Sequence, residues 1–314
     1  MTHRVLLTDY PWPDVEIEKQ ILAEVDAELI VAPESDEATL TLCATDVDAI
    51  LTTWAAVTRG ILEAATKCRM VSRMGIGLDN IDVEYCTSRG MVVTNVPDYC
   101  AVEVAEHALA LILSLGRKVA HYHAETKQGN YNLQSGPPLR RLAGQTLGIV
   151  GYGNSGRKLA ELAGGLGFKV VVSTRTVPSE ASNVTFCDLE TLLAQSDYVS
   201  LHLPLNETTR HLINVESLAL MKPTAYLINT SRGGIIDHQA LTSVLQQEQL
   251  AGAALDVQDP EPPDMSQTPF NDPRVVVTPH AAFASTESVE ALRTRATAQV
   301  AQLLRGETPD NVVN

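Results

Sequence analysis

One strand-turn-helix stretch near the middle of the chain constrains its fold more than any other feature. The apolar run Thr146–Val150 leads into Gly151, Gly153 and Gly156, and the helix-like segment Arg157–Ala163 follows. Because glycine has no Cβ, such a turn lets a pyrophosphate approach the free N–H groups at the start of the helix. The spacing therefore predicts a dinucleotide site. A glycine-rich turn without a ligand is the alternative, but the strand before it and the helix after it favour the site.

The residues that close the next strand predict which nucleotide is bound. The strand Lys169–Ser173 ends at Thr174-Arg175-Thr176. An acidic side chain here would bind the 2′-hydroxyl of the adenine ribose, whereas a cation with two hydroxyls suits a 2′-phosphate. We therefore expect NADP(H), with NAD(H) as the other cofactor to test. An ordinary solvated surface charge is the other interpretation of Arg175.

Short apolar runs alternate with helix-like segments along the chain. Before the glycine turn the runs are Val5–Thr8, Leu29–Val31, Ala49–Leu51, Met70–Ser72 and Met91–Val93, separated by helical spacing as in Val15–Val25 and Ile61–Ala65. This alternation predicts an α/β fold of two doubly wound parallel sheets with helices on both faces. We expect residues 1–100 to form one unit and residues 101–284 a second. The last helix, Ser288–Leu304, has no strand after it, so residues 285–314 are expected to cross back and make the first unit discontinuous.

Each predicted strand beyond the glycine turn ends in polar residues. The strands are Tyr198–His202, Tyr226–Asn229, Ala253–Asp256 and Val275–Thr278, and the polar side chains at their ends are His202, Thr230, Ser231, Arg232, Asp256 and His280. In a doubly wound sheet the carboxyl ends of the strands form the ligand crevice. These side chains are therefore predicted to face cofactor and substrate.

Three of the residues near these ends suit hydride transfer to a carbonyl. Arg232 can fork onto a carboxylate and the adjacent carbonyl oxygen. His280 can give or take a proton, since histidine titrates near neutral pH. Glu261, in a loop between two prolines, can hydrogen-bond the imidazole. Taken singly, each has an ordinary interpretation as a surface arginine, a loop histidine or a solvated glutamate, and it is their joint placement that supports catalysis.

The other histidines are weaker candidates. His107 lies on the apolar helix Val102–Leu115 and is interpreted as a hydrogen-bonded packing residue. No short-spaced cluster of His, Cys or carboxylates predicts a metal site. The loop-rich stretch His121–Leu142 is predicted to be an arm that packs on a second copy of the chain, which implies a homodimer.

The charge and cysteine content exclude several classes of function. A net charge of -15 over 314 residues argues against nucleic acid or an anionic membrane as partner. The five cysteines are scattered and odd in number, which fits a reducing cytoplasm better than a disulfide framework. We expect neither a signal peptide nor a membrane span, because the longest apolar run, Ala108–Leu115, is too short for one.

Seven motifs together resemble one known family, the D-isomer-specific 2-hydroxyacid dehydrogenases. They are Gly75–Asp82, Ala105–His107, the turn Gly151–Gly156, His202–Leu205, Asn229–Gly234, Ala254–Val257 and Thr278–His280. The resemblance implies a flavodoxin-like substrate domain, into which a Rossmann nucleotide domain is inserted, and a dimer made through the nucleotide domain. It also implies catalytic roles for Arg232, Glu261 and His280.

The resemblance and the strand-end rule together give a set of expected binding residues. For the cofactor these are Gly151, Tyr152, Gly153, Asn154, Ser155, Gly156, Thr174, Arg175, Thr176, His202, Pro204, Thr209, Thr230, Ser231, Asp256 and Ala282, with Asp256 on the nicotinamide carboxamide. For the substrate they are Trp54, Met74, Gly75, Ile76, Arg232 and His280, with backbone N–H groups around Gly75 and Ile76 on the carboxylate.

Departures from the family pattern narrow the expected activity. Members that act on phosphorylated serine precursors carry an arginine where this chain has Thr52-Thr53-Trp54, so we expect a small or apolar 2-oxo acid. The lack of an acidic residue at Thr174, followed by Arg175, resembles the pattern of the family's NADPH-dependent glyoxylate and hydroxypyruvate reductases. Asn154-Ser155 replaces the customary Arg-Ile, so one usual pyrophosphate contact is absent. A nucleotide-sensing corepressor and a phosphite-type dehydrogenase, which share the fold, are the alternatives.

Overall fold

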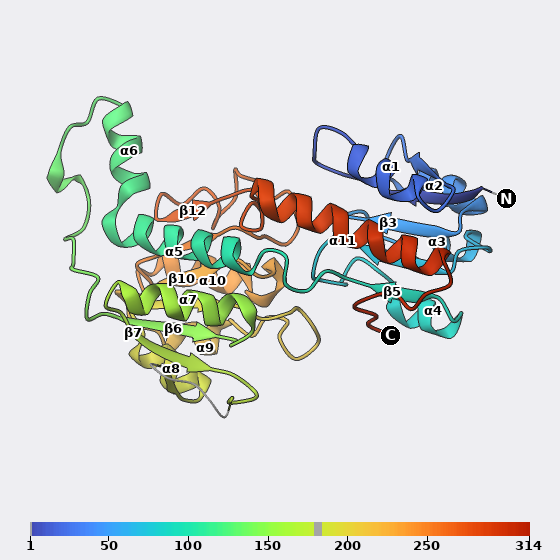
Figure 1. Ribbon diagram of the computed structural model, residues 1–314. Coiled ribbons are helices and arrows are strands. Elements are labelled where there is room, and N and C mark those ends of the chain that lie inside the picture. The colour runs from blue at the N-terminus through green and yellow to red at the C-terminus, as the bar shows by residue number, and fades with distance from the viewer. Residues whose placement is uncertain (1, 179–183) are drawn as a thin grey trace. The chain divides into compact units, whose positions relative to one another are not determined.

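The chain folds into two compact units (Figure 1). The computed structural model describes residues 2–178 and 184–314. The first unit comprises Met1–Tyr99 and Ser285–Asn314, and the second comprises Cys100–Ala284. Each is a parallel sheet covered by helices, and the second is inserted into the first, so the predicted fold class is confirmed.

The sheet of the first unit has five parallel strands in the order β2-β1-β3-β4-β5. They are β1 (His3–Leu7), β2 (Ala27–Val31), β3 (Ala49–Thr52), β4 (Met70–Arg73) and β5 (Val92–Thr94), and the helices are α1 (Glu16–Ala23), α2 (Glu37–Cys43), the 3₁₀ turn η1 (Ala44–Asp46), α3 (Arg59–Ala64), α4 (Val83–Ser88) and α11 (Thr286–Leu304). Alternate residues of β1 enter different cores, with Leu6 on one side and Val5 and Leu7 on the other. Burial on both faces explains why these strands read as unbroken apolar runs.

Helix α11 returns the end of the chain to the first unit. Leu292, Ala296 and Val300 pack in the same core as β1. On the same helix the nearly buried guanidinium of Arg293 binds the fully buried carboxylate of Glu18 on α1, with an Nη2–Oε2 distance of 2.7 Å. The helix therefore belongs to the unit that the N-terminal strands build.

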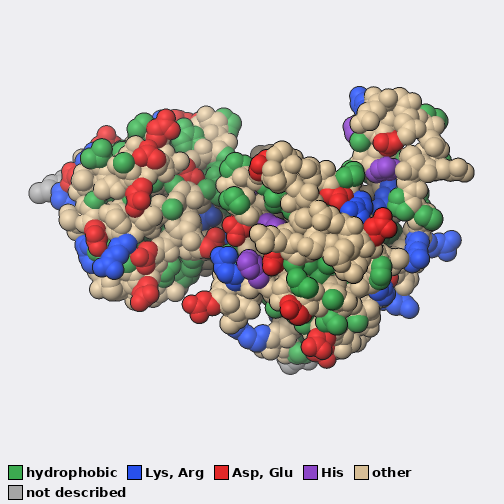
Figure 2. Space-filling view, turned by 180° about the vertical axis from the view of Figure 1, so that it is seen from behind, with side chains coloured by type: hydrophobic (Ala, Val, Ile, Leu, Met, Phe, Trp, Pro, Cys, Tyr) green, Lys and Arg blue, Asp and Glu red, His purple; other side chains and the backbone are tan. Residues whose placement is uncertain are grey.

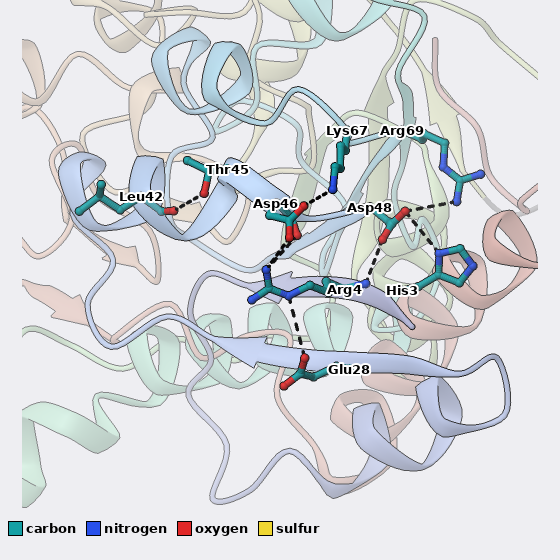
Figure 3. A network of polar contacts seen from close by, with 9 residues as sticks. All are labelled: His3, Arg4, Glu28, Leu42, Thr45, Asp46, Asp48, Lys67 and Arg69. Atoms are coloured by element: carbon teal, nitrogen blue, oxygen red, sulfur yellow. Dashed lines mark hydrogen bonds and ion pairs between the residues drawn. The ribbon is translucent and has the colours of Figure 1, made fainter. Parts of the chain in front are cut away.

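A network of charged side chains joins the amino ends of β1, β3 and β4 (Figure 3). Arg4 donates from its backbone N–H to Asp48 and from its guanidinium to Asp46, at 2.9 and 3.0 Å. Lys67 also binds Asp46, and Arg69 lies 3.9 Å from Asp48. Because all these side chains are partly exposed, each pair contributes little to stability and the network aligns strand starts rather than forming a site.

The sheet of the second unit has seven parallel strands in the order β12-β11-β10-β9-β6-β7-β8. They are β6 (Thr146–Val150), β7 (Lys169–Ser173), β8 (Thr185–Phe186), β9 (Tyr198–Leu201), β10 (Tyr226–Asn229), β11 (Gly252–Leu255) and β12 (Val275–Val277). The chain moves outward in one direction from β6 to β8 and in the other from β9 to β12. Ligands of such sheets bind at this switch point, beyond the carboxyl ends of β6 and β9.

Helices cover both faces of this sheet (Figure 1). They are α5 (Ala101–Arg117), α6 (Val119–Lys127), α7 (Asn154–Gly165), α8 (Leu189–Gln195), α9 (Val215–Ala219) and α10 (His238–Gln246), with the 3₁₀ turns η2 (Leu133–Ser135) and η3 (Gly233–Ile235). Helices α5 and α7 share one core with β6 and β7, while α8, α9 and α10 share the other. Within the described ranges, none of the helices combines the length and apolarity needed to cross a bilayer.

The structure corrects one local prediction. The sequence predicts a loop-rich stretch from His121, but the structure forms α6 there. All side chains of α6 lie at least partly in solvent, so it has no buried stripe for a periodicity to reveal. Lys118 separates α6 from α5 in a left-handed conformation with φ of 57°, and its ammonium donates to the Tyr226 hydroxyl at 2.7 Å. The segment stands out from the body of its unit at the upper right of Figure 2.

Candidate active site

The glycine turn after β6 is shaped by close backbone contacts. Gly151 has a φ of 97°, and a Cβ there would collide with the carbonyl oxygen of His202. A Cβ on Gly156 would collide with the carbonyl oxygen of Gly151. At Gly153, by contrast, no atom of the described residues lies within 4 Å of the place a Cβ would take. The first and third glycines thus close the turn, and the second leaves its surface open.

The start of α7 can accept an anion. Its N-cap is Gly153, and among the described side chains none caps the helix. The first N–H groups of a helix lack partners within it and favour negative charge. Tyr152, Asn154 and Ser155 stand in the same turn, so this part of the expected cofactor set is assembled around one open helix end. A dinucleotide's pyrophosphate fits this cradle.

The predicted nucleotide-selecting residues follow β7 directly. Thr174 is half-buried, whereas Arg175 and Thr176 are exposed. Arg175 forms no hydrogen bond or ion pair with any residue that the structure describes. A guanidinium at the carboxyl end of β7 is thus open to a ligand.

The ends of β9 and β10 supply further expected cofactor residues. His202 is almost buried, and its ring contacts Ser155 and Ser200. Ser231 donates its hydroxyl to the Leu201 carbonyl oxygen at 2.6 Å, joining the two strand ends. Thr230 Oγ1 is buried without a hydrogen-bond partner among the described residues, and such an orphan beside a predicted ligand crevice fits a site that a cofactor completes.

The loop between β9 and α9 holds two more of the expected cofactor residues. Pro204 is exposed, and its carbonyl oxygen accepts the Thr209 hydroxyl at 2.7 Å. Both lie on the carboxyl side of β9.

Asp256 anchors the turn that carries His280. This carboxylate is fully buried, and it accepts the Thr278 hydroxyl at 2.6 Å and the N–H groups of Ala281 and Ala282 at 2.9 Å each. His107 Nε2 lies 3.1 Å from Thr278 Oγ1, so the packing histidine on α5 is hydrogen-bonded to the same turn. Asp256 therefore holds the turn in addition to its expected role on a carboxamide.

His280 and Glu261 form a close pair. His280 Nδ1 lies 2.8 Å from Glu261 Oε2, and the Gln258 N–H donates to Glu261 Oε1 at 2.9 Å. His280 has a φ of 52°, and its N–H donates to the Asp256 carbonyl oxygen at 2.8 Å. A non-glycine residue held in the left-handed region is uncommon, and such strain gathers at functional sites. The contact through Nδ1 leaves Nε2 of the imidazole for a reacting group.

The charge around Glu261 favours its carboxylate form. Burial acts to raise the pKa of Glu261, but the hydrogen bond and charge of His280, the Gln258 N–H and the charge of Arg232 together lower it below the ordinary value. Arg232 itself, after β10, donates to the Ser231 carbonyl oxygen at 2.8 Å. The arginine, glutamate and histidine predicted from three separate segments thus influence one another within the second unit.

The expected substrate residues of the first unit follow β3 and β4. Met74 is buried, while Trp54 and Ile76 are exposed. The backbone carbonyl oxygens of Gly75 and Ile76 accept hydrogen bonds from Val96 N–H and Asn95 Nδ2 at 2.9 and 2.8 Å. Both donors belong to the segment that directly follows β5, so this segment holds the loop after β4 in place.

The structure reveals supporting residues that the sequence prediction missed. Asp9 accepts from the N–H groups of Thr53 and Trp54 at 3.1 and 2.7 Å, and so holds the loop after β3. Gln258, nearly buried, donates from its side chain to the carbonyl oxygens of Leu255 and Thr278 at 3.0 and 3.3 Å. Polar residues at strand ends were the only available signal for both.

A glycine turn at the switch point of a doubly wound sheet, with an imidazole–carboxylate pair at its strand ends, defines a nucleotide-dependent dehydrogenase. Among the described residues no three His, Cys, Asp or Glu side chains are grouped to hold a metal ion.

Comparison with known proteins agrees with this class. Residues 109–282 match the family described as D-isomer specific 2-hydroxyacid dehydrogenase, NAD binding domain. The chain is 38% identical over 279 residues to a glyoxylate reductase of Thermococcus litoralis, covering 86% of this chain and 84% of that protein. The chain belongs to the D-isomer specific 2-hydroxyacid dehydrogenase family. The predicted family and the predicted enzyme class are confirmed.

Solved structures extend the similarity over both units. An NADPH-dependent glyoxylate/hydroxypyruvate reductase from Sinorhizobium meliloti, in complex with NADP and malonate, superposes with a TM-score of 0.88 at 27% identity, covering 100% of this chain and 97% of that one. A D-lactate dehydrogenase from Aquifex aeolicus, complexed with NAD and lactic acid, also has a TM-score of 0.88 at 27% identity, covering 97% and 96%. The protein is thus an NAD(P)-dependent 2-hydroxyacid dehydrogenase.

Proposed function

We propose that this protein uses NADPH to reduce a small 2-oxo acid of the glyoxylate or hydroxypyruvate kind to its D-2-hydroxy acid. The observation that carries the proposal is the 2.8 Å contact between His280 Nδ1 and Glu261 Oε2, with Arg232 close enough to lower the glutamate's pKa. The relatives with glyoxylate reductase activity in their names support the substrate class.

Each of the three residues has a distinct task in this reaction. A nicotinamide cofactor, which Gly151–Gly156 and Asp256 would hold, would supply the hydride that reduces the substrate carbonyl. His280 delivers a proton from Nε2 to the carbonyl oxygen, while Glu261 holds Nδ1 and stabilises the charged imidazolium before transfer. Arg232 polarises the carbonyl and holds the carboxylate, because a guanidinium presents parallel donors to two oxygens. Loss of His280 is expected to lower turnover by roughly 10² to 10⁴.

The preference for NADPH rests on the residues after β7. Arg175 is exposed and unengaged by described residues, and hydroxyls flank it on both sides. A 2′-phosphate would give this guanidinium a charge-assisted partner, whereas a 2′-hydroxyl would not. No carboxylate stands at Thr174 to favour the hydroxyl.

The preference for a small, unphosphorylated acid rests on the loop after β3. This loop, Thr52-Thr53-Trp54, contains no cation for a phosphate. Trp54 is exposed and its backbone N–H is held by Asp9, so this loop offers an apolar ring to a short side chain.

A substrate and cofactor panel tests the proposal. Turnover of glyoxylate, hydroxypyruvate, pyruvate and phosphite is measured with NADPH and with NADH, using wild type, Arg175→Ala and the control Lys169→Ala, which removes a cation at the opposite end of β7. We expect higher kcat/KM with NADPH on a small 2-oxo acid, and loss of that preference only in Arg175→Ala. A clear NADH preference would refute the cofactor assignment. Cofactor binding without turnover would favour a nucleotide sensor, and activity with phosphite alone would favour the inorganic-anion enzyme.

We also propose a cytoplasmic homodimer. All five cysteines are free, which suits a reducing compartment, and burial raises the pKa of Cys68 and Cys86 to about 12 and about 11, so these two thiols stay protonated at neutral pH. The segment after α6 exposes Tyr131 and Leu133 by 93% and 78%, which suits burial against a second copy. Light scattering of wild type and of Tyr131→Asp is expected to give a dimer and a weakened dimer, and a monomeric wild type would refute this arrangement.

A further inference from the structure

We propose that His202 and Ser200 fix the Ser155 hydroxyl as a hydrogen-bond donor to the cofactor's pyrophosphate. This chain has Asn154-Ser155 where the family pattern has Arg-Ile, and so lacks one usual pyrophosphate contact. The Ser155 hydroxyl would replace that contact. The inference deepens the proposed function, because it rests on NADPH binding at the glycine turn, and it assigns His202 and Ser200 as positioning residues.

The three side chains form one hydrogen-bonded chain. Ser155 Oγ lies 3.1 Å from His202 Nδ1, and Ser200 Oγ lies 2.9 Å from His202 Nε2. Ser200 is fully buried within β9, while Ser155 stands half-buried on the first turn of α7. The chain therefore runs from the core of the sheet to the open end of the helix.

The contact depends on the shape of the glycine turn. His202 N–H donates to the Val150 carbonyl oxygen at 2.7 Å, and the carbonyl oxygen of His202 faces the Cα of Gly151 so closely that a Cβ would not fit. This approach brings the imidazole at the end of β9 beside the helix start that follows β6. The histidine is thus part of the turn's support.

Counting donors and acceptors gives the direction of the chain. If His202 carried its hydrogen on Nε2, Ser200 Oγ would accept it, and the Ser200 hydrogen would have no other acceptor among the described residues. A fully buried donor without a partner is strongly disfavoured. Ser200 therefore donates to Nε2, and the hydrogen of the ring lies on Nδ1 and is donated to Ser155 Oγ. Because Ser155 then accepts from the ring, its own hydrogen is directed away, toward an anion on the turn.

The imidazole remains neutral near physiological pH. Burial lowers the pKa of His202 to about 4, so the ring carries a single N–H there. A neutral ring with one donor and one acceptor has a fixed polarity, whereas an imidazolium would donate on both sides and reverse the Ser200 contact.

Calorimetric titration with NADPH tests the assignment without catalysis. We expect Ser155→Ala to weaken NADPH binding about tenfold, the size of one hydrogen bond to a charged group. Ser200→Ala, which removes a hydroxyl that cannot itself reach a ligand through the strand, is expected to weaken binding about threefold. The control Ser196→Ala removes another fully buried hydroxyl near β9, one that donates to the Leu192 carbonyl oxygen at 2.6 Å, and should leave affinity unchanged.

The tautomer of His202 gives a second readout. Long-range ¹H–¹⁵N correlation spectra of histidine-labelled protein, assigned with His202→Gln, should report an Nδ1–H tautomer with and without NADPH. An Nε2–H tautomer, or wild-type affinity in Ser155→Ala, would overturn the proposal while leaving the cofactor assignment intact. If wild type binds neither NADPH nor NADH, the proposed function itself fails.

Discussion

Replacement of Glu261 by glutamine is the sharpest test of the proposed acid–base pair. The substitution keeps the size of the side chain and removes its charge. In the wild type both carboxylate oxygens accept: Oε1 from the Gln258 N–H at 2.9 Å and Oε2 from His280 Nδ1 at 2.8 Å. An amide has only one acceptor side, so in either orientation its NH₂ group faces one of these two donors.

The expected loss follows from that mismatch. A hydrogen bond to a charged group is worth about 1.5–3 kcal/mol, and about 1.4 kcal/mol corresponds to a tenfold change in rate. The His280 and Glu261 side chains are 24% and 33% exposed, so water can replace part of the interaction. We therefore expect the lower part of this range, a fall in kcat of about 10- to 30-fold.

Steady-state reduction of the best 2-oxo acid, followed by loss of NADPH absorbance, measures this effect. The control is Glu207→Gln, an exposed carboxylate in a loop of the same unit. Its kcat should match the wild type, and the KM for NADPH should be unchanged in both variants. Wild-type turnover in Glu261→Gln, with unchanged thermal stability, would refute the view that this carboxylate positions and charges His280.

Three further predictions concern the cofactor turn, the core and acid pH. Gly156→Ala should weaken NADPH binding more than tenfold in a fluorescence titration, because its Cβ would meet the carbonyl oxygen of the turn's first glycine. Glu18→Leu should lower the free energy of unfolding in urea by about 3 kcal/mol, since it leaves the buried guanidinium of Arg293 without its closest partner. Because the pKa of Glu261 is lowered in the folded protein, its carboxylate stabilises the fold fully above the ordinary pKa of 4.5, and this stabilisation is lost as pH falls through the folded pKa. The difference in unfolding free energy between wild type and Glu261→Gln should therefore shrink below about pH 4.5.

Much of the fold was predictable because both sheets are parallel and buried on two faces. The residues of β3 and β4 are all buried, so each strand appears in the sequence as an apolar run between helix-like segments. The elements that escaped prediction have no such signature. Helix α6 buries none of its side chains, and the edge strand β8 has two residues, too few for any pattern.

The candidate site was predictable where it depends on strand ends, and unpredictable where it depends on side chains that reach across the chain. His280 follows β12, and strand order alone brings it to the crevice. Gln258 supports the same turn through a carbonyl oxygen 20 residues away, and Asp9 holds a loop 44 residues away. No local sequence pattern predicts either contact, because each contact depends on which strands become neighbours in the sheet.

The two units hold their functional loops with the same device. In the first, Asp9 accepts from two consecutive backbone N–H groups, those of Thr53 and Trp54, and from the hydroxyl of its neighbour Thr8. In the second, Asp256 accepts from the consecutive N–H groups after His280 and from the hydroxyl of Thr278, which directly follows the adjacent strand β12.

A carboxylate at a strand end suits this task because it has two oxygens and accepts from several donors at once. It can therefore fix a loop whose outer surface stays free for ligands. The opposite strand ends of the first unit are instead joined by exposed ion pairs such as Arg4 with Asp46 (Figure 3), which are weaker and screened by salt. In the first unit, the carboxyl ends of the strands, where Asp9 holds the loop, are thus the ends that carry the expected substrate residues. Fixed loops at these ends suit a preorganised binding site.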